Sequence, residues 1–157
     1  MLSADGIVLD KAGGKQDKRG YIEVNDELQT NVSHIWALGD CNGEGAFTHT
    51  AYNDFQIVNS HLFEERKRYL SDRFTCYAAF IDPPLASVGI NNNVIKKAGI
   101  KAKVAIRHMS KIARAKEKGK TARQIKLIIE SDTKKILGGN FLGAVANEYI
   151  HIVIDQM

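Results

Sequence analysis

The first seventy residues combine short apolar runs with glycine-rich turns and one longer amphipathic stretch. Residues 21–24 and 35–38 are short runs of residues that favour strands, and turn-forming residues follow each of them. From residue 48 to residue 69, apolar side chains recur at helical spacing. The apolar positions that define this helical face are Ala51, Phe55, Val58 and Leu62. We therefore predict two short strands followed by one helix.

Beyond a linker at residues 71–73, the pattern changes to apolar runs separated by turns. These runs predict five strands, at residues 77–81, 85–90, 103–109, 125–130 and 136–142. The last two strands are separated by a polar turn and are predicted to form a hairpin. Residues 91–98 are predicted to form a short helix that ends at Gly99. Residues 112–118 are ambiguous, and we interpret them as a loop or short turn.

A final helix is predicted from Ala144 to the end of the sequence. Its apolar residues extend beyond a single helical stripe, so it should be buried or lie in an interface. It reaches Met157 without a Gly, Asn or basic capping residue, which is the pattern expected of a chain that ends within its structure. Together these elements predict an α+β fold in two parts, residues 1–70 and residues 73–157.

Composition agrees with a folded chain. Of its 157 residues, 44% are hydrophobic and 25% are charged, which is typical of globular proteins. No apolar run approaches the roughly 20 residues that a membrane-spanning helix needs. Residues 1–10 lack the basic and apolar regions of a signal peptide, so a cytoplasmic location is expected.

The cysteines and histidines do not predict a metal site. Cys41 and Cys76 form no CxxC or CxxxxC pair and match no zinc signature, so we expect two buried, reduced thiols. Four histidines have no ligand spacing and are interpreted as structural or surface residues: His34, His61, His108 and His151.

The net charge of +4 is unevenly distributed. Residues 91–126 contain nine lysines and three arginines but one acid, Glu117, and such a block is typical of nucleic-acid binders. The same segment contains no Phe, Tyr or Trp that could stack on bases, and the sequence contains no helix-turn-helix or zinc motif. Nucleic-acid binding is therefore kept only as a remote alternative to a solvated basic face.

Three segments, in this order, resemble a known enzyme family. They are Thr30-Asn-Val-Ser-His-Ile-Trp-Ala-Leu-Gly-Asp40, then Phe80-Ile-Asp-Pro-Pro-Leu-Ala-Ser-Val-Gly89, and then Ile136-Leu-Gly-Gly-Asn-Phe-Leu-Gly143 with the helix that follows. Together they resemble the class I pyridine nucleotide-disulfide oxidoreductases, the family of dihydrolipoamide dehydrogenase and mercuric reductase. The loop at residues 42–54 is similar to the mercuric-reductase-like branch.

The resemblance implies an identity for each part of the chain. Residues 1–70 would be the C-terminal remnant of an FAD-binding domain. Residues 73–157 would be a dimerisation domain of about five mostly antiparallel strands, truncated at its C-terminus, through which the protein forms a homodimer. The first of the three segments resembles the family's second flavin motif.

In that motif, the resemblance implies that Asp40 holds the ribityl chain of FAD. A carboxylate that follows a glycine at a strand end can approach a polyol closely, and Gly39 would permit that approach. An isolated aspartate would as readily form an Asx-turn or cap a helix, and that alternative stays open.

The resemblance also places residues of the predicted helix along the isoalloxazine ring of FAD: Phe47, Thr48 and Ala51. The backbone N–H groups at the start of this helix would point at the ring, where a helix N-terminus stabilises negative charge. His49 is interpreted first as a packing neighbour of the flavin and second as a participant in its chemistry.

Other parts of the family's chemistry have no counterpart in this sequence. It contains no GxGxxG motif in a βαβ unit, no nicotinamide-binding domain and no CxxxxC disulfide. We therefore identify no catalytic residue and expect NAD(P) to bind only in the parent enzyme. The predicted function is part of an FAD-dependent oxidoreductase that passes electrons between NAD(P)H and a disulfide or related acceptor, with the isolated chain inactive. The main alternative is a homodimerisation or interaction module without catalysis.

Overall fold

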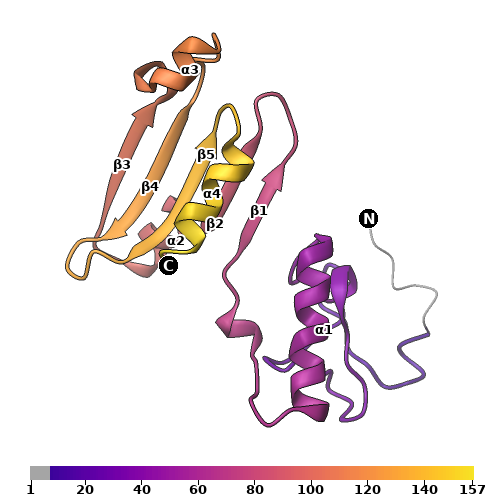
Figure 1. Ribbon diagram of the computed structural model, residues 1–157. Coiled ribbons are helices and arrows are strands. Elements are labelled where there is room, and N and C mark those ends of the chain that lie inside the picture. The colour runs from indigo at the N-terminus through magenta and orange to yellow at the C-terminus, as the bar shows by residue number, and fades with distance from the viewer. Residues whose placement is uncertain (1–7) are drawn as a thin grey trace. The chain divides into compact units, whose positions relative to one another are not determined.

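The computed structural model describes residues 8–157, which form two compact units that meet between Arg73 and Phe74 (Figure 1). The first unit is mostly turns and loops around a single long helix. The second unit is a five-stranded antiparallel sheet with flanking helices. The α+β fold class predicted from the sequence is confirmed.

In the first unit, helix α1 (Thr48–Phe63) packs against loops and two 3-10 turns, η1 (Gly39–Asn42) and η2 (Leu70–Asp72). The strands predicted at residues 21–24 and 35–38 are wrong. Each segment makes only one isolated bridge, Ile22 with Gln16 and Trp36 with Gln29. In both cases the backbone hydrogen bonds extend only to the residues that flank the bridge, so the pairing is too short to make a strand.

Helix α1 ends at Phe63, six residues before the predicted end at Tyr69. Lys67 folds back over the C-terminus, where its Nζ donates to the carbonyl oxygens of Ser60, His61 and Glu64 at 3.2, 3.3 and 2.7 Å. A lysine in this position satisfies carbonyl groups that have no partner within the helix, so the chain turns there.

The buried face of α1 differs from the predicted one. Its buried residues are Asp54, Ile57, Val58 and Ser60. Phe55 and Leu62, two of the four predicted face residues, are 50% and 47% exposed. The prediction failed because an apolar periodicity search assigns polar residues to the solvent face, and here an aspartate and a serine point inward.

The first unit has two small hydrophobic clusters, one that packs a loop against α1 and one formed between loops. Leu28, Ile57 and Val58 form one cluster, and Leu9, Ile22 and Ala37 form the other. The partly buried Val24 packs against both clusters.

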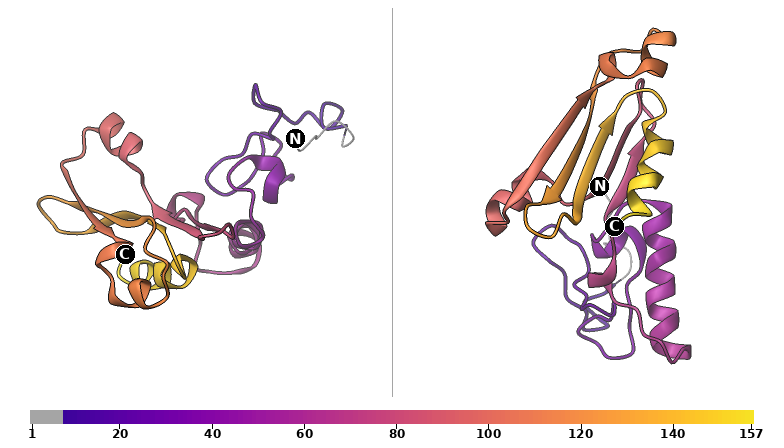
Figure 2. Two further views of the ribbon diagram at one scale, coloured as in Figure 1. Left: turned by 90° about the horizontal axis from the view of Figure 1, so that it is seen from above. Right: turned by 60° about the vertical axis from the view of Figure 1, so that its left-hand side comes forward.

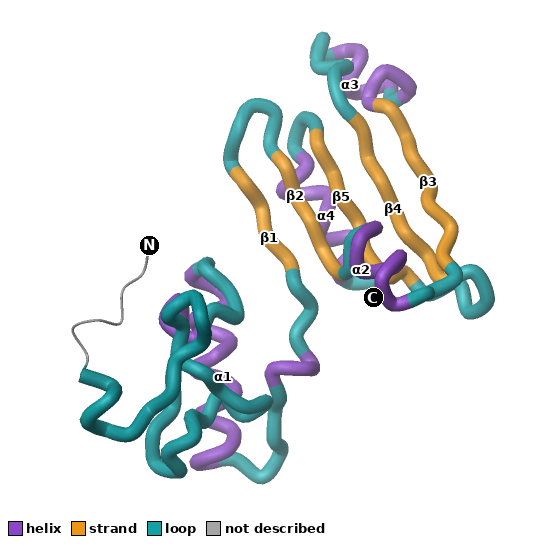
Figure 3. The backbone as a smooth tube through the Cα atoms, turned by 180° about the vertical axis from the view of Figure 1, so that it is seen from behind, coloured by secondary structure: helices purple, strands orange, loops and turns teal. Residues whose placement is uncertain are grey.

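The second unit contains one sheet in the order β1-β2-β5-β4-β3, antiparallel throughout (Figure 3). Its strands are β1 (Cys76–Ala79), β2 (Leu85–Gly89), β3 (Ala102–His108), β4 (Gln124–Glu130) and β5 (Ile136–Leu142). The predicted β4–β5 hairpin is confirmed, with a register irregularity between Ile128 and Ile129.

Three helices flank this sheet. They are α2 (Asn92–Ala98), α3 (Ala113–Glu117) and α4 (Ala146–Ile154). Helix α2 ends as predicted at Gly99, which has a left-handed backbone with φ of 66°. Helix α3 falls within residues 112–118, where we expected a loop or short turn.

Helix α4 covers one face of the sheet and builds its core, while α2 lies on the opposite face (Figure 2). The core residues are Ala86, Val88, Phe141, Ala146, Ile150 and Val153. The final helix, expected to be buried or to lie in an interface, buries Ala146, Ile150 and Val153 here and leaves Tyr149 and Ile152 exposed. Within residues 8–157, no helix is both long enough and apolar enough to cross a bilayer.

Candidate functional site

The turn at Gly39 and Asp40 packs against the first turns of α1. Gly39 is buried and has a left-handed φ of 77°, which a residue with a Cβ rarely adopts. A Cβ atom at this position would lie 3.5 Å from the Cβ of Ala51. That distance is ordinary contact, so the left-handed backbone, rather than a lack of space, is what favours glycine at this position.

Asp40 is partly exposed beside this turn. Its backbone carbonyl accepts the N–H of Gly43 at 3.3 Å, but its carboxylate makes no hydrogen bond or ion pair with residues 8–157. In the described part of the chain, Asp40 therefore forms no Asx-turn and caps no helix with its side chain. Its two carboxylate oxygens remain available as acceptors for a ligand.

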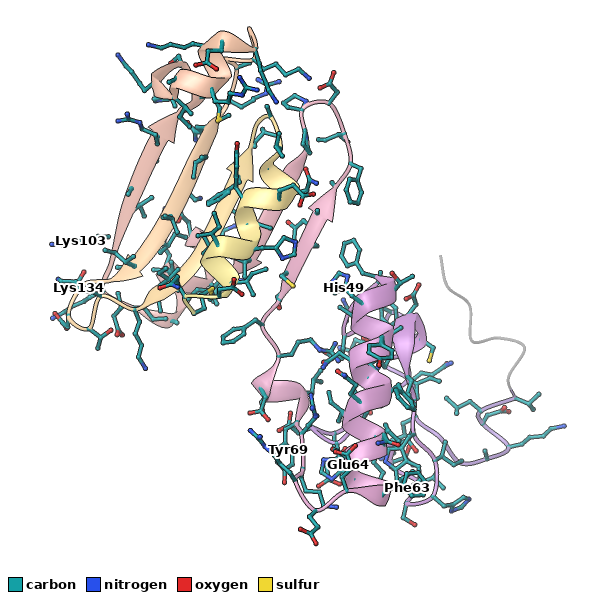
Figure 4. The ribbon with its side chains drawn as sticks, in the orientation of Figure 1. His49, Phe63, Glu64, Tyr69, Lys103 and Lys134 are labelled. Carbon is teal, nitrogen blue, oxygen red and sulfur yellow. The ribbon has the colours of Figure 1, made fainter. Side chains whose placement is uncertain are left out.

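The N-terminus of α1 contains the remaining predicted site residues, which are Phe47, Thr48, His49 and Ala51. The hydroxyl of Thr50 donates to the carbonyl of Phe47 at 2.6 Å, and it accepts the N–H of Phe47 at 3.2 Å. The ring of His49 stacks on the ring of Phe47 with centroids 5.4 Å apart. His49 lies at the start of α1, far along the helix from Phe63 and Glu64 (Figure 4).

The first turn of α1 is exposed and could bind a negatively charged group. Thr48 is exposed, and its backbone N–H has no hydrogen-bond partner among the described residues. Such N–H groups carry the positive end of the helix dipole. The turn at Gly39 and Asp40 and the exposed first turn of α1 therefore form one candidate site.

Asp54 organises this site, and the sequence analysis missed it. Its side chain is buried, and its residue is only 1% exposed. Its Oδ2 accepts the N–H of Gly39 and the side-chain amide of Asn42, both at 2.8 Å, while its Oδ1 forms an ion pair with Arg73. The only sign of Asp54 in the sequence was an acidic residue between apolar positions of the predicted helix, and a search for apolar periodicity ignores such a residue.

Cys41 lies next to Asp40 but is not set up as a nucleophile. Its Sγ donates to the carbonyl of Leu38 at 3.2 Å, and burial, together with the carboxylates of Asp54 and Asp40, raises the pKa of the thiol. A thiol with a raised pKa stays neutral near pH 7 and reacts slowly. Within residues 8–157, neither Cys41 nor Cys76 forms a disulfide, and both are partly exposed, whereas we expected buried thiols.

Of the four histidines interpreted as structural or surface residues, one makes packing contacts and three are exposed. The Nε2 of His61 lies 2.7 Å from the carbonyl of Arg68, and its ring meets Tyr69 edge-on at 5.1 Å. The other three, His34, His108 and His151, are exposed. Residues 8–157 contain no group of three or more His, Cys, Asp or Glu side chains that could hold a metal ion.

In the second unit, the outer side of α4 exposes two large apolar residues beside the polar Glu148 and His151. Ile152 is 66% exposed and Tyr149 is 40% exposed, while Ile150 and Val153 on the inner side are buried. Half of the twelve basic residues between positions 91 and 126 lie at exposed positions of α2, β3 and α3.

Two family profiles match this chain in order. The profile described as pyridine nucleotide-disulphide oxidoreductase, dimerisation domain, matches residues 75–155, and the profile described as pyridine nucleotide-disulphide oxidoreductase matches residues 3–54. The first match covers the five-stranded sheet and its helices. The second includes the turn at Gly39 and Asp40 and the first turns of α1.

The sequence of this chain is also similar to those of curated oxidoreductases. The chain is 33% identical over 145 residues to RclA of Escherichia coli, described as a pyridine nucleotide-disulfide oxidoreductase, covering 92% of this chain and 33% of RclA. It is 32% identical over 148 residues to the dihydrolipoyl dehydrogenase of Buchnera aphidicola, covering 94% of this chain and 31% of that enzyme. The chain thus spans about a third of the length of these relatives.

The fold is also shared. A solved structure of the HOCl-induced flavoprotein disulfide reductase RclA from Escherichia coli superposes with a TM-score of 0.85 and 30% identity, over 98% of this chain and 35% of the RclA chain.

Proposed function

This chain belongs to the pyridine nucleotide-disulphide oxidoreductase family, and on that premise we propose that it supplies one edge of an FAD site together with a dimerisation unit. The parent activity would be the transfer of electrons between NAD(P)H and a disulfide or a related acceptor. The sequence holds no CxxxxC pair and no GxGxxG motif, so we expect no NAD(P)H oxidation by this chain alone.

The observation that carries this proposal is the pairing of an open carboxylate with an exposed helix start. Gly39 adopts a left-handed backbone at the turn, and neither the carboxylate of Asp40 nor the backbone N–H of Thr48 has a partner within residues 8–157. These groups suit the ribityl hydroxyls of a flavin and the negative charge that its ring gains on reduction.

Each group has a separate role. Asp40 would accept hydrogen bonds from the ribityl hydroxyls, and bonds to an ionised acceptor are stronger than neutral ones. The first turn of α1, including Thr48, would orient the ring and stabilise negative charge on it through the helix dipole. Phe47, His49 and Ala51 would pack beside the ring, with the stacked pair Phe47–His49 excluding water. When bound, FAD supplies the electron-transfer chemistry of the parent reaction.

Equilibrium titration tests the flavin site. We expect FAD to bind this chain saturably, as followed by quenching of flavin fluorescence, and we expect Asp40→Ala to weaken binding about tenfold or more. This corresponds to about 1.4 kcal/mol, the lower end of what a hydrogen bond to a charged group contributes. Glu23→Ala is the matched control, because Glu23 is exposed and its carboxylate has no partner in the described residues. Absence of saturable binding would overturn the proposal.

The second unit is proposed to form a homodimer that buries the outer side of α4. Ile152 is the most exposed large apolar residue of that helix. We expect sedimentation velocity to show a dimer that Ile152→Glu dissociates, since a charge buried in an interface without a partner is costly. His151→Glu places the same charge on the neighbouring exposed residue and should dissociate the dimer less. A monomeric wild-type chain at micromolar concentration would contradict this assignment.

A further inference from the structure

Three donors from three different segments converge on the buried carboxylate of Asp54. Gly39 donates its backbone N–H from the turn before Asp40, and Asn42 donates its side-chain amide from the end of the same turn. Arg73, the last residue of the first unit, donates its guanidinium. One side chain of α1 therefore ties the candidate flavin turn and the end of the unit to the same helix.

The donors are themselves held in place. The amide of Asn42 also donates to the carbonyl of Ala37 at 3.0 Å, and its Oδ1 accepts the N–H of Glu44 at 2.9 Å. The Nε of Arg73 donates to the Oδ1 of Asn53 at 2.7 Å. Asn42 and Arg73 thus each bind a second group besides Asp54, and these contacts restrict movement of the turn.

A buried carboxylate is not needed if the position serves only to pack the helix against the turn. Removing a charge from water costs several kcal/mol, and a well-packed apolar pair of similar volume is often as stable. A carboxylate does what an apolar residue cannot, because it fixes the direction of a specific N–H group. At this place that N–H belongs to Gly39, which immediately precedes Asp40.

We propose that Asp54 is a positioning residue for the flavin edge, holding Gly39 so that the carboxylate of Asp40 faces the N-terminus of α1. Arg73 neutralises the buried charge and links this geometry to the last residue of the unit. The inference rests on the proposed FAD site and adds residues that neither the motif nor the helix periodicity identifies.

Titration of FAD into Asp54→Asn tests this role. An amide presents one acceptor oxygen and one NH2 group, so at least one of the three donors loses its partner. We expect FAD binding to weaken about tenfold or more, since a hydrogen bond to a charged group is lost. We also expect the visible circular dichroism of bound flavin to change, because the ring and ribityl chain would sit differently. Asn42→Ala removes one donor and leaves the ion pair, so it should shift both signals less and in the same direction.

Asp26→Asn is the control for a purely structural effect. Asp26 accepts the backbone N–H and the hydroxyl of Ser71, both at 2.7 Å, so it also ties the end of the unit down but does not touch Gly39. We expect its FAD affinity and flavin dichroism to match the wild-type chain. Equal effects of Asp54→Asn and Asp26→Asn at equal loss of stability would overturn the positioning role.

The other outcomes separate the two proposals. A wild-type chain that binds FAD while Asp54→Asn binds it equally well refutes the positioning role alone. A wild-type chain that does not bind FAD refutes the flavin site and this inference together. If Asp54→Asn does not fold, unchanged FAD affinity and dichroism in Asn42→Ala refute the inference.

Discussion

Replacing Arg73 with alanine is expected to lower the free energy of unfolding of the first unit by about 3–5 kcal/mol. The ion pair of Arg73 with Asp54 is nearly fully buried, with side-chain exposures of 10% and 2%. Removal of the cation leaves a buried carboxylate without its counter-charge, and this uncompensated charge, more than the lost contact, accounts for the expected size of the effect.

The single tryptophan, Trp36, makes this measurement specific to the first unit, because the second unit contains none. Urea unfolding followed by its fluorescence gives the free energy from the midpoint and slope. Arg68→Ala is the matched control, since Arg68 is exposed and its guanidinium forms no ion pair within residues 8–157. Its effect should stay within about 0.5 kcal/mol.

A double variant distinguishes charge from packing. Asp54→Leu combined with Arg73→Met removes both charges and should recover a large part of the stability that Arg73→Ala loses, because apolar replacement of a buried ion pair is often neutral. A loss in the double variant equal to the sum of the single losses would mean that the two side chains do not interact energetically.

Gly138→Ala is expected to destabilise the second unit by about 1–3 kcal/mol, the usual cost of overpacking a well-packed site. A Cβ at Gly138 would lie 2.3 Å from the carbonyl oxygen of Ile90, where the backbones of β2 and β5 pass each other. Gly89, its partner in register, meets the same limit, since its Cβ would lie 2.3 Å from the carbonyl oxygen of Leu137. The obstructing atoms belong to the backbone, so no side-chain rotation relieves the clash.

Gly139→Ala provides the control one residue away. Gly139 is also buried in β5, but its Cβ would meet its neighbours at 3.5 Å or more, which is ordinary contact. We expect this variant to be neutral or slightly stabilising, because alanine restricts the unfolded chain. Hydrogen exchange of the Ile90 amide, which donates to Leu137 at 2.9 Å, reports the β2–β5 junction. Equal exchange in both variants would show that the close backbone approach does not control stability.

Much of the second unit could be predicted from the sequence because its signals are local. Alternating apolar runs between turn residues predicted all five strands within one or two residues of their bounds, and the Gly99 cap of α2 followed from backbone freedom at a helix end. In the sequence, Gly89 and Gly138 were only parts of two family motifs. The structure explains why both are glycine, because the backbones of β2 and β5 lie too close there for a Cβ atom.

The candidate site was predictable only in part. Gly39, Asp40 and the first residues of α1 follow from a motif that is contiguous or nearly so along the chain. Asp54 lies 15 residues from Gly39 and 19 from Arg73, and neither spacing marks a contact in a sequence. Its inward direction also reverses the rule that polar helix residues face solvent, because three donors offset the cost of burial.

The sequence by itself therefore determined the α+β fold class, the strands of the sheet and the motif at Gly39 and Asp40, since periodicity and turn chemistry act over a few residues. Only the tertiary structure decided three features: the sheet order β1-β2-β5-β4-β3, the end of α1 at Phe63 where Lys67 binds its last carbonyl groups, and the hydrogen-bond network around Asp54. The sheet order and the Asp54 network depend on groups distant along the chain that meet only when the backbone is folded, where hydrogen bonding and desolvation outweigh local propensity. The end of α1 depends on a side chain only three to seven residues away, whose backward direction an apolar pattern does not reveal.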